Sequence, residues 1–208
     1  MATRIPPAAP SKPATVETIE AKRRAPSQKR AKSTFETILE AATQILEREN
    51  PAALNTNYIA ERAGISIGTL YQYFRNKNEI LVAIAQRQFE SDSSAALGAM
   101  ASARADDPEA ERFVIRALID SYKVRRKTRR AAIDAIVAEG LSDQRVGPVA
   151  AIADAVLARG GLTPAGVFVL TRAVNGVLRA TTEEESPLLG TKEFEDELVR
   201  LVRNFLAG

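Results

Sequence analysis

The side chains that could do chemistry in this sequence are carboxylates, hydroxyls, amides and basic groups. Cysteine and histidine are both absent from the 208 residues. Their absence removes thiol and imidazole nucleophiles, imidazole general bases, the usual zinc ligand sets and any disulfide. The acidic residues are scattered along apparent helices and do not follow the glycine-containing spacing of a metal-binding loop. We therefore expect no enzymatic activity, no cofactor and no metal.

The distribution of charge favours binding to a polyanion. The net charge is only +3, but basic residues gather near the start of the chain and acidic residues near its end. The basic group is Lys12, Lys22, Arg23, Arg24, Lys29, Arg30 and Lys32, and the acidic group is Glu183, Glu184, Glu185, Glu193, Glu195, Asp196 and Glu197. This asymmetry indicates one end that meets a polyanion and another that does not.

The stretch from Thr56 to Phe74 has the spacing of two short helices joined by a tight turn. The small Ala60 allows the helices to approach closely, and Gly64 permits the turn. Ile65 and Leu70 fill the space between the helices. This spacing fits a helix-turn-helix DNA-binding unit. An ordinary helical hairpin in a bundle has the same spacing, so the spacing alone leaves both interpretations open.

The elements around this motif are predicted to be helices, and no run of alternating apolar and polar residues indicates a strand. The first helix carries apolar residues at helical spacing from Phe35 to Leu46 and ends near Asn50, because Pro51 disfavours helical geometry in the residue before it. A second short helix is expected over residues 67–74. Asn76 then caps a long helix that lasts to about Ala103.

Further helix starts are predicted in the second half of the chain. Asp107 with Pro108 opens one helix, Ser142 caps another, and Thr163 with Pro164 opens a third after a break at Gly160 and Gly161. Thr191 caps the last helix. The fold class is therefore all-α.

The chain divides into three predicted regions. Residues 1–26 are rich in proline, alanine, serine, threonine and basic residues, and form a disordered basic arm. Residues 27–75 form the helix-turn-helix domain, and residues 76–208 form a helical C-terminal domain. No apolar stretch is long enough to span a bilayer, and the prolines in the first ten residues exclude a secretory signal. We expect a cytoplasmic protein that does not enter a membrane.

Two runs of sequence resemble the TetR family of transcriptional regulators. The run IAERAGISIGTLYQYFRNKNEIL, Ile59–Leu81, is similar to the signature of that family, and ILEAATQIL in the preceding helix is similar to its first helix. The resemblance covers about residues 28–90. It implies a homodimeric repressor that binds a double-stranded DNA operator and is released by a small-molecule effector. A ligand-independent regulator controlled by a protein partner is the alternative.

The same resemblance implies which residues contact DNA. Thr56 caps its helix and binds a phosphate, and Asn57 reaches a phosphate or a base edge. Ile67, Gly68 and Thr69 enter the major groove, where Ile67 and Thr69 suit thymine methyl groups. The remaining contacts to phosphates or bases are assigned to Tyr71, Gln72, Tyr73 and Lys77. Two other residues of this segment, Leu70 and Phe74, are predicted to be core.

A helix around Phe168–Leu178 is apolar nearly all round and must be covered on two sides. One cover is the core of the chain itself, and the other is most simply a second subunit. The resemblance implies the same arrangement, with dimerisation through residues 164–182 and 192–206. The interface residues are predicted to be Val169, Ala173, Gly176, Leu198, Val202 and Phe205.

Two further groups of residues have competing interpretations. Ligand-binding residues are proposed from the helices that line the cavity in the family, with plain core packing as the alternative: Phe89, Tyr122, Phe168, Arg172 and Asn175. The basic stretch Lys123–Arg130 is most simply a solvated helix face. It would otherwise be a second nucleic-acid patch, or Arg125 or Arg126 would capture an acidic ligand.

This sequence departs from the family pattern in two places. Its N-terminal arm is longer than usual, and a basic arm would add phosphate or minor-groove contacts. A cloning artefact or mis-annotated start is the competing explanation for that length. The second departure is Asn50-Pro51, where a glycine commonly ends the first helix. It changes the turn and leaves the resemblance intact.

Overall fold

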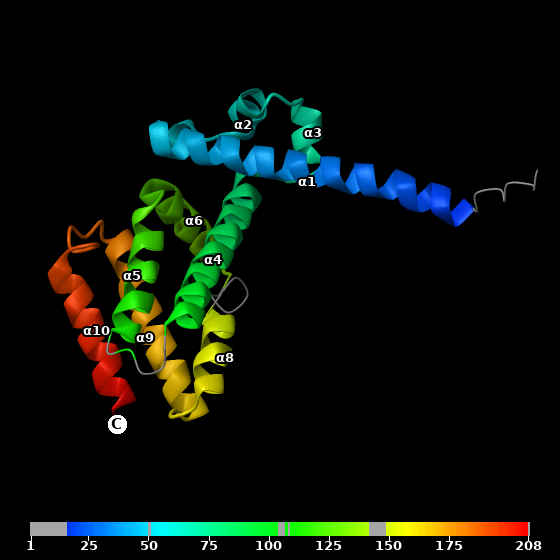
Figure 1. Ribbon diagram of the computed structural model, residues 1–208. Helices are drawn as coiled ribbons and strands as arrows, with labels where there is room; N and C mark the ends of the chain where they lie inside the picture. The colour runs from blue at the N-terminus through cyan, green and yellow to red at the C-terminus, as the bar shows by residue number, and fades with distance from the viewer. Residues whose placement is uncertain (1–15, 50, 104–106, 108, 142–148, 208) are drawn as a thin grey trace, which may run out of the picture. The chain divides into compact units, whose positions relative to one another are not determined.

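The computed structural model describes residues 16–49, 51–103, 107, 109–141 and 149–207. Every regular element in these ranges is a helix (Figure 1), which confirms the all-α prediction. The chain separates into two compact units, residues 1–37 and residues 38–208. Within the described ranges no helix combines the length and the apolar character needed to cross a bilayer.

Helix α1 runs from Val16 to Arg48 and begins earlier than the sequence predicted. The prediction of a disordered arm up to residue 26 is wrong for residues 16–26, which are helical, and residues 1–15 lie outside the described part of the chain. The part of this segment before Pro26 contains several strong helix formers. They are Glu17, Glu20, Ala21, Lys22 and Arg23.

Helix α2 spans Thr56–Ala63 after a short 3-10 turn at Pro51–Ala53. Its N-cap is Asn55, whose Oδ1 accepts a hydrogen bond from the Tyr58 backbone N–H at 2.9 Å. Thr56, predicted to be the cap, is instead the first helical residue. The extended backbone of Asn55 places its amide oxygen beside the open N–H groups of the first turn, and asparagine serves that position well.

The predicted turn between the two short helices is confirmed at Gly64. Its φ of 67° is left-handed, and the Ile65 N–H reaches back to the Ala60 carbonyl at 3.0 Å. Helix α3 then spans Ile67–Tyr71 with Ser66 as its N-cap. It ends three residues before the predicted Phe74, because the chain tightens into a turn at Gln72 and the next helix must be capped only four residues later.

Helix α4 spans Lys77–Ser102, and the Asn76 cap is confirmed by the 2.9 Å bond from the Glu79 N–H to its Oδ1. Helix α5 begins at Ala110 and ends at Lys123, and helix α6 spans Arg126–Ala138. The break between α5 and α6 was not predicted, because Arg125 adopts a left-handed φ of 54° inside an otherwise helix-forming basic stretch.

The last three helices are α8 (Val149–Arg159), α9 (Pro164–Glu183) and α10 (Lys192–Leu206). The predicted break is confirmed at Gly160 and Gly161, which both have positive φ. Side chains of Thr163 and Thr191 accept first-turn N–H bonds and confirm both predicted caps. Ser142, the other predicted cap, lies outside the described residues.

The helices of the C-terminal half pack around a common core. Helix α4 contacts α5 and α6, α10 runs along α5, and α8 runs along α9 (Figure 1). The core combines apolar side chains from three helices: Ile115, Ile119 and Tyr122 of α5, Leu170, Val174 and Leu178 of α9, and Leu198, Val199 and Val202 of α10. This packing leaves a cavity between α4, α5, α8, α9 and α10.

Candidate DNA-contacting face and pocket

The helix-turn-helix residues divide into a buried set and an exposed set. Leu70 is fully buried and Phe74 nearly so, as predicted for the core. Ile59 and Ala60 of α2 are buried as well, and Tyr73 is half-buried. The buried side of α3 therefore anchors it within the domain, and its remaining side chains face outward.

The exposed set forms one face, which we call the candidate DNA-contacting face. Ile67, Gly68, Tyr71 and Gln72 of the α3 segment are exposed, and so are Asn57 of α2 and Lys77 of α4. Thr56 and Thr69 are half-buried at its edge. The Thr56 hydroxyl and the Tyr71 hydroxyl lie 3.2 Å apart, which joins the start of α2 to α3. The structure thus leaves most of the predicted DNA-contacting residues exposed and links two of them, Thr56 and Tyr71, across α2 and α3.

Gly68 is a residue that the fold itself does not require. A Cβ at this position would meet only the Ser66 Oγ, at 3.8 Å, and its φ is not in the left-handed region. Glycine in a helix costs roughly 0.5–1 kcal/mol relative to alanine. The glycine therefore supports close approach of something outside the chain.

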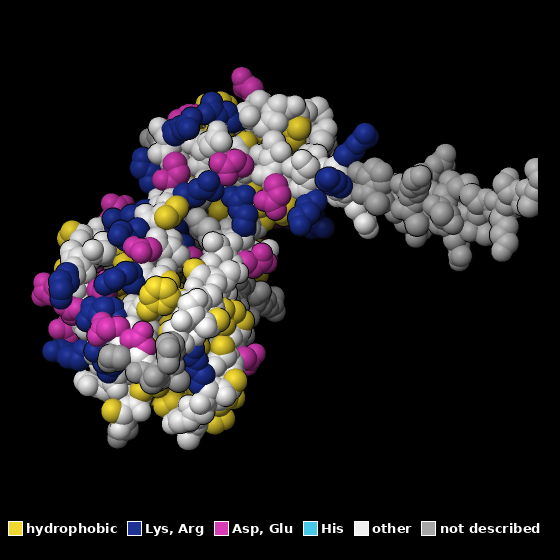
Figure 2. Space-filling model, in the orientation of Figure 1, with side chains coloured by type: hydrophobic (Ala, Val, Ile, Leu, Met, Phe, Trp, Pro, Cys, Tyr) yellow, Lys and Arg dark blue, Asp and Glu magenta, His cyan; other side chains and the backbone are white. Residues whose placement is uncertain are grey.

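The face carries little charge of its own. Figure 2 shows a mostly uncharged surface over α3. Helix α3 contains no charged residue, and Lys77 is the first residue of the next helix. Arg75, between them, pairs weakly with Glu79 at 3.9 Å. The cationic groups therefore flank the recognition helix, where they can meet phosphates, while polar and apolar groups occupy its centre.

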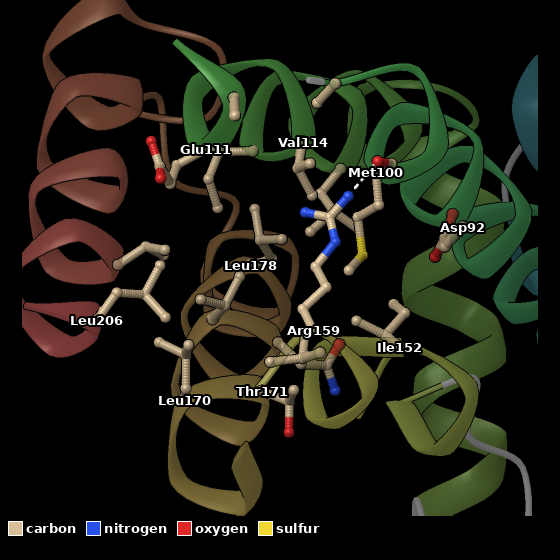
Figure 3. Close-up of a pocket in the computed structure, with 18 of the residues that line it drawn as sticks. Asp92, Met100, Glu111, Val114, Ile152, Arg159, Leu170, Thr171, Leu178 and Leu206 are labelled. Atoms are coloured by element: carbon tan, nitrogen blue, oxygen red, sulfur yellow. Dashed lines mark hydrogen bonds between the residues drawn. The ribbon is translucent and has the colours of Figure 1, made fainter. Parts of the chain in front are cut away.

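A cavity of about 460 Å³ lies within the C-terminal helices (Figure 3). Two of the predicted ligand-binding residues, Tyr122 and Asn175, line it, and the Tyr122 hydroxyl donates to Asn175 Oδ1 at 2.9 Å. Phe89, Phe168 and Arg172 do not line it. Phe168 is 55% exposed, because it lies on the side of α9 away from the cavity-lining Leu170, Val174 and Leu178, and the Arg172 guanidinium lies 5.1 Å from its ring.

A buried ion pair between Asp92 and Arg129 lies beside the cavity. Arg129 donates to both carboxylate oxygens of Asp92, at 2.7 Å and 3.0 Å, and to the Ser121 carbonyl at 3.0 Å. Its guanidinium carbon lies 4.1 Å from the centre of the Tyr122 ring. Only Asp92 of the two ions lines the cavity. The bidentate pair neutralises that carboxylate, so Asp92 presents little net charge to a ligand.

Arg159 is a cavity residue that the sequence did not reveal. It is the last residue of α8, and its guanidinium donates to the Met100 carbonyl in the last turn of α4 (Figure 3). No local pattern distinguishes this arginine from other surface arginines. Its place depends on the packing of α8 against α4 and α9.

The predicted dimer residues differ in exposure between the two helices: those of α9 are exposed or half-buried, and two of those of α10 are buried. Val169 is 52% exposed, Gly176 is exposed and Ala173 is half-buried, so α9 presents an outer apolar face. Leu198 and Val202 belong to the core of the chain itself, which corrects their assignment to an interface. The apolar stripe of α10 turns inward to cover α5 and α9. Phe205 is half-buried, and Leu201, which was not predicted, is 40% exposed.

The basic stretch Lys123–Arg130 is occupied by internal partners. Arg125 pairs with Glu40 at 3.2 Å, and Arg130 pairs with Glu185 at 2.6 Å. Lys127 donates to the Glu47 carbonyl at 3.3 Å, and Arg126 donates to the Ser186 carbonyl at 3.2 Å. The stretch therefore ties helices together. Lys123, Arg125 and Lys127 remain exposed, as expected for a solvated face, and neither Arg125 nor Arg126 lines the cavity.

The described residues hold no cluster of three or more acidic residues that could bind a metal ion. One pKa shift occurs near the DNA-contacting face. A hydrogen bond from the Tyr58 hydroxyl to Glu49, at 2.7 Å, raises the pKa of Tyr58. This bond fastens α2 to the end of α1.

Comparison of sequences with known proteins gives matches to a limited part of the chain. Residues 38–84 match the family model of bacterial regulatory proteins of the tetR family. The transcriptional repressor KstR of Mycolicibacterium smegmatis is 40% identical over 53 residues, a match that covers 26% of this chain and 26% of KstR. The curated relatives are thus matched over only about a quarter of their length.

Solved structures match over most of the chain. The crystal structure of BioQ is 27% identical, with a TM-score of 0.56, and the match covers 82% of this chain and 96% of BioQ. A structure of BioQ with its double-stranded DNA operator matches with a TM-score of 0.55. A TetR-family regulator from Streptomyces coelicolor, 21% identical, shares the fold with a TM-score of 0.59 over 84% of this chain and 98% of that one. Residues 38–84 thus match the N-terminal domain of the tetR family of bacterial regulatory proteins, and the chain shares its all-helical fold with solved regulators of that family.

Proposed function

We propose that this protein is a transcriptional repressor that binds a palindromic operator as a homodimer and is released by a small molecule. The observation that carries the proposal is the candidate DNA-contacting face, with Gly68 at its centre. The buried Leu70 anchors α3 in the core of the domain. At Gly68, the position of the missing side chain is not filled by any other part of the described chain. Such a protein would act in the cytoplasm, where the DNA of a bacterium lies.

The composition of this face supports a DNA ligand. Half to two-thirds of protein–DNA hydrogen bonds go to the sugar-phosphate backbone. Lys77 and the hydroxyls of Thr56 and Tyr71 would supply such bonds at the edges of the face. Ile67 and Thr69 would meet thymine methyl groups in the major groove. BioQ has been solved in complex with its double-stranded DNA operator. In that complex it shares the fold of this chain and is 26% identical to it.

The outer face of α9 supports a second copy of the chain as partner. Phe168, Val169 and Val177 are each more than a third exposed, and Gly176 has open space where a side chain would stand. Large apolar side chains around a small residue permit close helix packing. A dimer would cover this surface and set the spacing of two recognition helices at about one turn of DNA, ~34 Å.

The cavity supports control by a ligand. Its volume of about 460 Å³ lies in the range of small-molecule sites, roughly 300–1,000 Å³. Its walls are mainly apolar, with a few polar groups including Tyr122 and Asn175. Helix α4 contributes Asp92 and Met100 to the cavity and begins at Lys77 on the DNA-contacting face, so one helix joins the two sites.

The DNA-binding proposal can be tested with the full-length protein and a random duplex pool. Repeated selection should enrich a palindrome whose half-sites are about one turn apart, and fluorescence anisotropy on that duplex should then show weaker binding by Lys77→Ala. Loss of a phosphate contact should also lower the salt slope by about one. Lys123→Ala removes an equal charge outside the face and should bind as the wild type does. A pool without an enriched sequence would contradict the proposal.

The dimer can be tested by placing a charge on α9. Gly176→Glu adds volume and charge at the proposed interface, whereas nothing within the protomer obstructs the new Cβ. Sedimentation should therefore show a folded monomer for this variant and a dimer for the wild type. Gly98→Glu is the control, because Gly98 also has open space but lies on α4. A monomeric wild type at micromolar concentration would exclude the dimer.

A further inference from the structure

We infer that Arg159 makes the cavity selective for an apolar molecule that carries a carboxylate. The inference rests on the proposed function only in that the cavity is taken as the effector site. It adds the chemical class of the effector and the residue that recognises it.

Among the described residues, the charges around the cavity leave one cation without a carboxylate partner. Two carboxylates line the wall: Asp92 pairs with Arg129, and Glu111 pairs with Arg203 at 3.3 Å. Arg159 is the one basic residue among the described lining residues, and no carboxylate in the described part of the chain forms an ion pair with it. An anion that enters the cavity therefore meets a guanidinium that is not already neutralised.

The present partner of Arg159 is a weaker acceptor than a carboxylate would be. The guanidinium reaches from α8 across the cavity and donates to the neutral Met100 carbonyl (Figure 3). The present bond is charged on the donor side only, whereas a carboxylate adds a full opposite charge and can accept two parallel N–H bonds from the planar guanidinium. A carboxylate can therefore take over the donor from the helix end.

The rest of the wall specifies the other part of the ligand. Val114, Leu118, Ile152, Leu170 and Leu178 line the space around the guanidinium, and they offer no hydrogen bonds to a ligand. Burial of an alkyl or ring system against them is favourable in proportion to the apolar area removed from water. The combination fits an amphipathic acid and not a sugar, a nucleotide or a polyamine.

The exchange of partners also links binding to α4. Met100 lies in the last turn of α4, and Lys77 at the other end of the same helix lies on the DNA-contacting face. When Arg159 turns to a bound carboxylate, the last turn of α4 loses its bond to α8. Binding of the ligand thus costs a contact that had held α4 in place, and this cost couples the cavity to α4.

The test uses decanoate and decanol as matched probes, which have the same chain length and differ in the charge of the head group. Each would displace a neutral fluorescent dye, N-phenyl-1-naphthylamine, from the full-length protein. Decanol is the more hydrophobic probe, so apolar burial alone favours it. We expect decanoate to displace the dye at a concentration about tenfold lower than decanol, the lower end of the effect of a hydrogen bond to a charged group, because Arg159 is exposed to solvent.

Three variants assign the preference to Arg159. Arg159→Gln should lose the preference for decanoate, and Arg159→Lys, which keeps the charge, should retain part of it. Arg62→Gln removes an exposed arginine of α2, outside the cavity, and should behave as the wild type. Equal displacement by the two probes in the wild type, a preference for decanol, no displacement by either probe, or an unchanged preference in Arg159→Gln would each overturn the inference.

These outcomes are distinguishable from failure of the proposed function. Operator binding is measured on the same preparation without any probe. If the protein binds its operator but treats the two probes alike, the assignment of Arg159 fails while the DNA-binding proposal stands. If no operator is bound, the proposed function fails whatever the probes do.

Discussion

Gly68 is the second residue of the five-residue helix α3, and glycine stabilises a helix less than alanine does. A side chain there would meet no backbone and no atom of the described chain closer than 3.8 Å. Lys77 and Tyr71 lie on the same face. Both side chains are exposed, so they can be replaced without disturbing the core. At the level of single residues, contact with DNA and stability of the fold are therefore separable.

Replacing Gly68 by alanine should weaken operator binding while stabilising the protein. The methyl group would hold α3 away from the floor of the major groove, and we expect the affinity to fall by about tenfold or more, as for one mismatched contact. The lost chain entropy of glycine should add about 0.5–1 kcal/mol to the free energy of unfolding. Anisotropy and urea denaturation measure the two effects.

Gly98→Ala is the matched control for this change. Gly98 is also exposed and helical, and a Cβ added there would have no neighbour within 4 Å. It lies outside the DNA-contacting face. It should gain similar stability and keep its affinity for the operator. If Gly68→Ala also kept its affinity, the proposed close approach of DNA at this residue would be wrong.

At the level of elements, α6 depends on a cap from another helix. Its N-cap Arg125 makes no side-chain hydrogen bond to the first turn. Instead, Glu47 of α1 accepts bonds from the Thr128 backbone N–H at 2.8 Å and from the Thr128 hydroxyl at 2.6 Å. A side chain at the end of α1 therefore accepts a hydrogen bond from a backbone N–H in the first turn of α6, which has no partner within its own helix.

Glu47→Ala should lower the free energy of unfolding by about 1–2 kcal/mol, the usual cost of a lost N-cap. Glu47→Gln keeps the side-chain acceptor and should cost less. Chemical denaturation of both variants measures the difference. A Glu47→Ala protein as stable as the wild type would show that α6 does not need this cap.

The seam between α5 and α10 is held by a network of opposite charges. Arg112 contacts Glu195 at 2.9 Å and Asp196 at 2.6 Å, and Arg116 contacts Glu195 at 2.7 Å. Interspersed basic and acidic side chains cover this side of the molecule in Figure 2. The hydrogen bond from Arg116, followed by the bond from Arg112, holds the pKa of Glu195 below its usual value.

This lowered pKa predicts a loss of stability in acid. A carboxylate whose folded-state pKa lies below its unfolded value contributes stability at pH values above the unfolded pKa, about 4.5, and loses that contribution as the pH falls through the folded value. Glu195→Gln should therefore be less stable than the wild type near neutral pH, with the difference shrinking below about pH 4.5. Thermal unfolding between pH 3 and pH 7 measures this.

Glu193→Gln is the control for the acid experiment. Glu193 is exposed in the same first turn of α10 and has no ion-pair partner among the described residues. Its substitution should leave the slope of stability against pH almost unchanged. A difference between wild type and Glu195→Gln that stayed constant down to pH 3 would contradict the role of the network.

At the level of the whole molecule, α4 connects the DNA-contacting face to the cavity. A palindrome can be bound only when two recognition helices meet the major groove about one turn, ~34 Å, apart. A ligand that shifts α4 in each protomer would change this spacing. Such coupling must be reciprocal, because the free energies of binding form a closed cycle.

The reciprocal effect can be measured directly. If an apolar carboxylate such as decanoate weakens operator binding by some factor, the operator must weaken decanoate binding by the same factor. Dye displacement with and without saturating operator gives the second number, and anisotropy with and without decanoate gives the first. Equal affinity of decanoate for the free and the operator-bound protein would exclude the switch even if the cavity binds it.

Local sequence was sufficient to predict turns and helix ends where one or two residues determine the backbone conformation. Gly64 predicts its turn because a left-handed φ excludes most other residues, and Asn76, Thr163 and Thr191 cap their helices through bonds that span only three residues. The apolar spacing around Leu70 likewise predicts the buried side of α3. These features need no knowledge of distant parts of the chain.

Only the tertiary structure decided which surface each apolar or charged residue meets. Leu198 and Val202 have the spacing of an interface, yet they cover the core of their own chain, because α10 packs against α5 and α9. Arg159 and the Asp92–Arg129 pair join helices that are far apart in sequence. Periodicity shows that a helix has an apolar side. It does not show what that side packs against, because the partner is chosen by the arrangement of the other helices.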